Sequence, residues 1–118
     1  MTEFVLNLSD RRADLATAGG KGASLSRLAG ASLPVPDGFH LTTQAYHLFL
    51  AENQLQPAIE SILSGADPAD PATLEEASHA IREHFLQATI PASIAGAVAQ
   101  AYARLPGQNP PVAVRSSA

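Results

Sequence analysis

The chain has a single lysine, Lys21, and it stands inside the glycine cluster Gly19-Gly20-Lys21-Gly22. Glycine lets backbone N–H groups approach a ligand, and a following helix adds unpaired N–H groups and the positive end of its dipole. A lysine at such a place supplies a compact charge that suits phosphate. The cluster departs from two common phosphate-loop patterns, because Leu15 and Leu25 stand where those patterns need glycine. Two interpretations stay open: an anion site, or a turn before a helix with a solvated lysine.

A second candidate is Arg115, which follows the apolar run 112–114 and precedes Ser116 and Ser117. An arginine at the end of a buried strand, followed by two hydroxyl groups, could face a ligand at the edge of a sheet. Its guanidinium group can bind phosphate through two parallel hydrogen bonds. The alternative is an arginine that leaves the sheet and pairs with a surface carboxylate.

The other residues that often carry chemistry form no recognisable constellation. The histidines are His40, His47, His79 and His84. No two of them are three or four residues apart, so we expect them on surfaces rather than on a metal ion. Ser24 and Ser26 have no histidine nearby in the sequence and no nucleophile-elbow context. The sequence therefore assigns no catalytic residue and no metal ligand to this chain.

Hydrophobic periodicity and turn residues predict the elements that must position these groups. We expect strands at residues 4–8, 39–42 and 112–115, the last of them buried. We expect helices at residues 23–30, 43–53, 57–64, 71–88 and 91–105. Asp70 and Pro71 form an N-cap and N1 pair, Pro57 is expected at the first position of its helix, and Gly65 is expected to end that helix.

Apolar residues at helical spacing predict which helix faces are buried. The two clearest stripes are Leu25-Leu28-Ala29 and Tyr46-Phe49-Leu50. We interpret the second stripe as core rather than as a ligand cage. The predicted fold is a helix-rich α/β (α+β) structure with a small sheet.

Composition limits the function classes. The 118 residues allow one domain or part of one, and 46% apolar with 15% charged residues excludes a disordered tail or a coiled coil. A net charge of −4 argues against broad nucleic-acid contact, and the lack of cysteine excludes disulfides and thiolate metal sites. Neither a signal peptide nor an apolar run of roughly 20 residues is visible, so we expect a cytoplasmic protein without membrane contact.

Three segments together resemble one family. They are Ala18–Leu25, Leu33–Phe39 with the following Thr42-Thr43 and Ala45-Tyr46, and Val112–Ala118. In order and spacing they are similar to landmarks of the ATP-binding N-terminal region of phosphoenolpyruvate synthases and pyruvate phosphate dikinases. Rifampicin phosphotransferases share this region. The resemblance covers almost the whole chain.

The resemblance implies a fold and a reaction. The fold would be the first subdomain of an ATP-grasp-like nucleotide-binding domain. Enzymes of this family split ATP into AMP and phosphate and pass the β-phosphoryl group to a histidine on a swivelling domain. Pyruvate then accepts it, giving phosphoenolpyruvate, or rifampicin does so in the alternative branch. By resemblance, Lys21 and Arg115 contact the ATP phosphates, with Gly20, Gly22 and Ser116 as weaker candidates.

Several parts of the family's enzymes do not occur in this chain. The second ATP-grasp subdomain with its acidic Mg²⁺ ligands, the phosphohistidine domain and the acceptor domain are lacking. We therefore expect residues 1–118 to be a partial ATP-binding domain, truncated after Ala118 and inactive by itself. A stand-alone nucleotide-binding or regulatory module is the alternative. The unpaired last strand would also favour a homodimer.

Overall fold

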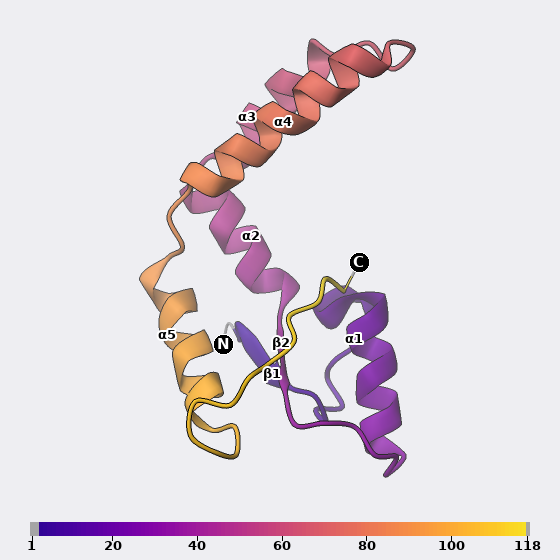
Figure 1. The fold of residues 1–118 in the computed structure, drawn as a ribbon, viewed down its shortest axis with the longest axis vertical. Coiled ribbons are helices and arrows are strands. Elements are labelled where there is room, and N and C mark those ends of the chain that lie inside the picture. Colours follow the sequence, from indigo (N-terminus) through magenta and orange to yellow (C-terminus); the bar gives the residue numbers. More distant parts are fainter. Residues whose placement is uncertain (1–2, 118) are drawn as a thin grey trace. The chain divides into compact units, whose positions relative to one another are not determined.

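Two short strands and five helices make up the part of the chain that the computed structural model describes, residues 3–117. They belong to two units (Figure 1). The first unit combines the residues up to Tyr46 with those from Ala92 onward, and the second is His47–Pro91. Both ends of the described chain therefore lie in the first unit.

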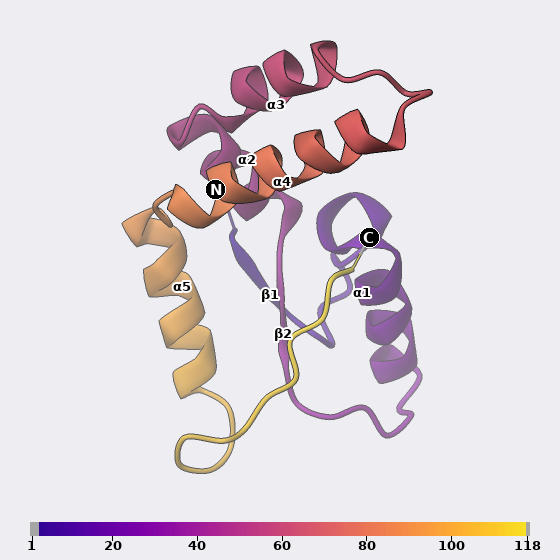
Figure 2. The ribbon, with the colours of Figure 1, turned by 45° about the horizontal axis from the view of Figure 1, so that its top comes forward.

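A two-stranded antiparallel ribbon is the centre of the first unit. Strand β1 (Val5–Asn7) pairs with β2 (Phe39–Leu41), so that Leu6 lies opposite His40. These two middle residues are buried, as strand alternation requires. Helix α1 (Leu15–Gly30) lies beside β2, and helix α5 (Ala92–Ala103) lies beside β1 (Figures 1 and 2).

Helix α1 begins earlier than the sequence predicted, because Asp14 caps it. The Asp14 carboxylate accepts from the backbone N–H of Thr17 at 2.9 Å, and the Thr17 hydroxyl accepts from the backbone N–H of Asp14 at 3.0 Å. This reciprocal capping box satisfies two N–H groups that the first turn leaves without acceptors. The carboxylate's role as an acceptor holds the pKa of Asp14 below its ordinary value.

The buried face of α1 is not the face with Leu25 and Leu28 that the sequence predicted. Leu25 and Leu28 are exposed by 37% and 43%, whereas the buried residues of α1 are Ala18, Gly22 and Ser26. These residues are small, and Gly22 and Ser26 both lie against His40, so the helix backbone approaches β2 closely. Large apolar side chains on that face would keep the helix away. The predicted leucine stripe was therefore wrong.

The second unit is an arrangement of helices with its own contacts. Helix α2 (Thr43–Glu52) begins in the first unit and runs into the second, where α3 (Leu55–Ser64) and α4 (Pro71–Gln87) form an antiparallel hairpin (Figure 2). The rings of Phe49 and Phe85 lie 5.8 Å apart between centroids. The Asn53 side chain donates to the carbonyl oxygen of Thr89 and accepts from its N–H, each at 2.9 Å.

Several predicted helix ends are confirmed. The Asp70 carboxylate caps α4 by accepting from the N–H of Ala72 at 3.0 Å, with Pro71 at the first helical position. Gly65 is the C-cap of α3. Pro57 is the third residue of α3 rather than the first, because the helix already begins at Leu55, which is only 2% exposed. Proline is tolerated at this position because the N–H groups of the first helical turn have no intrahelical acceptor.

One further expectation was wrong, and a second holds only in part. Residues 112–115 form no strand, and Val114 is 95% exposed. Within residues 3–117, β1 and β2 pair only with each other, so the segment 112–115 has no hydrogen-bonded partner strand. In the second apolar stripe Leu50 is buried, but Tyr46 is 49% exposed. The helix-rich α/β class with a small sheet is confirmed, with two strands rather than three.

Replacing Leu6 with alanine should lower the free energy of unfolding by about 2–4 kcal/mol, because it empties the centre of the first unit. Leu41→Ala on the paired strand is the matched control, since Leu41 is 55% exposed and should cost far less. Urea unfolding of both variants measures the difference. Equal losses would contradict the assignment of Leu6 to the core.

Candidate functional site

The glycine cluster lies at a break within α1. Gly19 has φ +73° and ψ 177°, a conformation open essentially to glycine alone, so α1 consists of a short segment up to Ala18 and a longer one from Gly20. The N–H groups of Gly20 and Lys21 belong to the first turn of the longer segment. In a regular helix such groups have no intrahelical acceptor. The break therefore creates a new helix N-terminus, and Lys21 is part of it.

The hydroxyl of Ser117 fills this break. It accepts from the backbone N–H of Gly22 at 2.7 Å and donates to the carbonyl oxygen of Ala18. A continuous α-helix would join these two groups directly, since they are four residues apart. Gly19 has no side chain with which to cap the new N-terminus, and Ser117 supplies the capping hydroxyl from the other end of the chain.

Glycine is required at Gly19 for a second reason. A Cβ atom there would collide with the backbone carbonyl oxygen of Ser117 and would come within 2.8 Å of its Oγ. The close approach of the C-terminal segment to the helix therefore depends on the missing side chain.

A buried Ser–His pair lies beneath the break. The hydroxyl of Ser26 and Nε2 of His40 share a hydrogen bond of 2.8 Å, and both residues are less than 10% exposed. Burial lowers the pKa of His40 below its ordinary value of 6.5, while the charge of Asp10 acts in the opposite direction. The expectation that His40 lies on the surface was wrong, and Ser26, which has no histidine nearby in the sequence, meets His40 only through the fold. Alternation with the apolar neighbours Phe39 and Leu41 predicts that His40 points outward, so no signal in the sequence pointed to its burial.

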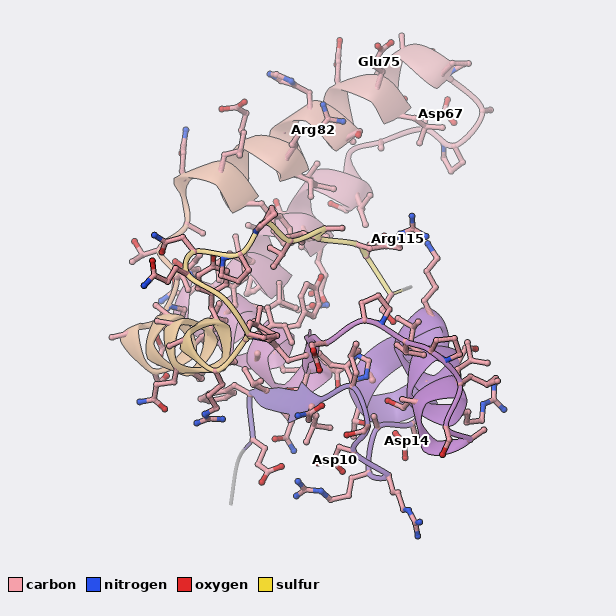
Figure 3. The ribbon with its side chains drawn as sticks, turned by 60° about the horizontal axis from the view of Figure 1, so that its bottom comes forward. Asp10, Asp14, Asp67, Glu75, Arg82 and Arg115 are labelled. Atoms are coloured by element: carbon pink, nitrogen blue, oxygen red, sulfur yellow. The ribbon has the colours of Figure 1, made fainter. Side chains whose placement is uncertain are left out.

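The two predicted cations are both exposed. Lys21 directly precedes Gly22, and Arg115 stands two residues before Ser117. Within residues 3–117 neither makes an ion pair, so the alternative in which Arg115 pairs with a surface carboxylate of this chain is not observed. Figure 3 shows Arg115 on the C-terminal segment, on the side of α1 away from Asp10 and Asp14. The Ser117–Gly22 bond thus connects the two cation-bearing segments.

The three weaker candidates for contact with the ATP phosphates differ in their surroundings. Gly20 and Ser116 are exposed beside the break. Gly22 is buried, and its N–H is already donated to Ser117, so that N–H serves the contact with the C-terminal segment. Gly22 must also remain small, because a Cβ atom would lie 3.0–3.1 Å from atoms of three neighbouring side chains.

Two acidic side chains of the first unit, Glu3 and Asp10, are neutralised by Arg12. Arg12 forms ion pairs with Asp10 at 2.7 Å and with Glu3 at 2.8 Å. The Arg12 guanidinium and N–H lower the pKa of Asp10 to about 2. These carboxylates are therefore engaged with Arg12. Across residues 3–117 we find no group of three His, Cys, Asp or Glu side chains placed to hold a metal ion, and no helix long and apolar enough to cross a membrane.

This arrangement is suited to anion binding rather than to covalent chemistry. It offers two exposed cations and the first turn of a helix, all of which stabilise negative charge. The one histidine close to it, His40, is buried and hydrogen-bonded to Ser26. The chemistry that these residues can supply is the placement and neutralisation of phosphate groups.

Comparison with known proteins identifies the family. The model of the pyruvate phosphate dikinase AMP/ATP-binding domain matches residues 15–118. The chain belongs to this family. The matched region contains the break at Gly19, Lys21 and the segment from Arg115 to Ser117.

Relatives of the chain carry two kinds of name. It is 41% identical to a phosphoenolpyruvate synthase of Deinococcus radiodurans over 92% of its length, and 43% identical to a probable phosphoenolpyruvate synthase of Methanocaldococcus jannaschii over 94%. It is also 38% identical to a rifampicin phosphotransferase of Streptomyces sviceus over 98%. The chain spans only 14%, 10% and 13% of these three proteins, respectively.

Gly19→Ala should destabilise the first unit by about 1–3 kcal/mol from backbone strain, with a further loss from the collision with Ser117. Gly96→Ala is the matched control, because Gly96 lies in α5 with φ outside the left-handed region and nothing within 4 Å of an added Cβ. That control should be neutral or stabilising by up to about 1 kcal/mol. Chemical unfolding compares the two, and an unchanged stability for Gly19→Ala would contradict the described break.

The buried His40 should make stability depend on pH. Because its pKa is lowered on folding, the unfolded chain binds a proton at His40 more readily than the folded chain does. Its contribution is therefore complete above about pH 6.5 and is lost as the pH falls below that value.

His40→Gln removes this titration while retaining a group that can hydrogen-bond to Ser26. We expect the free energy of unfolding to fall less between pH 7 and 5 in His40→Gln than in the unmodified protein. His79→Gln, at an exposed position, is the control and should keep the original slope. If the free energy of unfolding changes with pH in the same way in all three proteins, a lowered pKa for His40 is ruled out.

Proposed function

We propose that residues 1–118 form the N-terminal part of the ATP-binding domain of a longer, dikinase-type phosphotransferase, with Lys21 and Arg115 as its phosphate contacts. The observation that carries this proposal is the hydrogen bond between the Gly22 N–H and the Ser117 hydroxyl. This bond holds the segment that contains Arg115 against the first helical turn that contains Lys21. The two cations are 94 positions apart in the sequence, from 21 to 115, and the Ser117–Gly22 bond joins the segments that carry them. The membership of the ATP-binding domain family supports ATP as the anion.

The proposed reaction follows from the family. ATP, pyruvate and water would give AMP, phosphoenolpyruvate and phosphate, with the β-phosphoryl group carried by a histidine of another domain. Relatives named phosphoenolpyruvate synthase support pyruvate as the acceptor. The residues of this chain would bind and orient ATP, Lys21 by neutralising phosphate charge and Arg115 by gripping phosphate oxygens. Mg²⁺ would accompany the nucleotide and take its protein ligands from outside this chain, and the cytoplasm would supply the ATP.

Rifampicin is the alternative acceptor, and a rifampicin phosphotransferase at 38% identity is the observation that favours it. The two acceptors can be separated with the full-length gene product. Formation of AMP from ATP should depend on pyruvate and not on rifampicin. The reverse dependence would replace pyruvate by rifampicin, and nucleotide binding without AMP formation would favour a binding or regulatory module.

Lys21→Ala should weaken ATP binding of the full-length protein by roughly tenfold or more, since a charge-assisted contact contributes about 1.5–3 kcal/mol. Arg115→Ala should have an effect of similar size. Calorimetry or a fluorescent ATP analogue measures both affinities.

Arg27→Ala is the matched control, because Arg27 is an exposed cation near the other end of α1. Its removal should leave ATP affinity within about twofold of the original value. A similar loss in all three variants would indicate a general effect of net charge. Unchanged affinity in Lys21→Ala and Arg115→Ala would refute the proposed phosphate contacts.

A further inference from the structure

Ser117 joins two segments that the proposed ATP site needs together. Its hydroxyl is bonded to both the carbonyl oxygen of Ala18 and the N–H of Gly22, and so it spans the break that begins α1 anew at Gly20. Both bonds connect positions more than 90 residues apart in the sequence. Within the protein the hydroxyl thus acts both as donor and as acceptor.

The surroundings of Ser117 fit a small hydroxyl-bearing side chain. A Cβ atom on Gly22 would lie 3.1 Å from Ser117 Oγ and 3.1 Å from His40 Nδ1, so glycine at this position leaves just enough room for both neighbours. Gly19 makes room for the backbone of Ser117. The hydrogen bond between Ser26 and His40 holds the imidazole ring in place below. Gly19 and Gly22 therefore both leave room for Ser117, at its backbone and at its hydroxyl.

The segment that Ser117 fastens has few other attachments. Residues 111–116 are exposed, and they form no ladder with β1 or β2. A flexible arginine on an exposed extended segment would lose conformational freedom on binding a ligand, which weakens binding. A contact that fixes the backbone two residues away reduces this loss before the ligand arrives.

We propose that Ser117 is a positioning residue for nucleotide binding: its hydroxyl holds the Arg115 segment on the helix break that carries Lys21. This inference rests on the proposed function, because it assumes that both cations contact phosphate. Ser117 acts through Arg115 and needs no contact with ATP of its own.

A double-mutant cycle in the full-length protein tests the inference, with ATP affinity as the readout. Ser117→Ala should weaken ATP binding by about tenfold in the original background but by less than about twofold when Arg115 is already alanine. Ser117→Thr keeps the hydroxyl and should recover most of the affinity. Ser9→Ala, at an exposed serine of the same unit, should leave affinity unchanged.

The outcomes separate the inference from the proposed function. An equal loss from Ser117→Ala in both backgrounds, or no loss at all, overturns the positioning role. If Lys21→Ala and Arg115→Ala also bind ATP normally, the proposed function fails as well; if they bind weakly while Ser117→Ala binds normally, only the positioning role fails.

Should Ser117→Ala fail to fold, hydrogen exchange in the unmodified protein tests the same contact. The Gly22 amide should exchange at least about tenfold more slowly than the Lys21 amide, because only the former is bonded to Ser117. Equal exchange rates for these two neighbouring amides would overturn the inference.

Discussion

The close approach of α1 to its neighbours is the constraint on which the first unit depends. Ala18, Gly22 and Ser26 are small, so the helix backbone can lie near β2 and near the C-terminal segment. Without that approach the Ser26–His40 bond could not form, and Ser117 could not reach the backbone of Gly22. The glycines of the cluster are therefore needed first for packing, and the phosphate site that we propose follows from the same geometry.

The distribution of charge in the first unit also fits the proposed phosphate site. Arg12 engages Asp10 and Glu3 in ion pairs, whereas Lys21 and Arg115 have no carboxylate partner within residues 3–117. A cation without an internal partner is available for an external anion, and the N-terminus of the longer α1 segment adds to the positive potential. The chain has a net charge of −4, so this region is a local exception to its overall charge.

The second unit has a different physical basis. Its helices are held by the contact of Phe49 with Phe85 and by the paired hydrogen bonds of Asn53 with Thr89. None of the residues proposed to bind phosphate lies within His47–Pro91. Local capping accounts for its helix ends, since Asp70 and Gly65 stand where α4 begins and α3 ends.

The sequence by itself determined the helix-rich class, the Asp70 cap, the strand around His40 and the family, because each depends on residues near one another or on motifs in a fixed order. It also singled out Lys21 and Arg115 as candidates for phosphate contacts, a role that ATP-binding measurements will test. Only the tertiary structure decided that small residues rather than Leu25 and Leu28 face inward, that His40 is buried against Ser26, and that Ser117 caps the break at Gly19. It also left residues 112–115 without a ladder partner within the described chain. These features depend on contacts between distant segments, and spacing along the sequence carries no direct information about which backbones can approach each other.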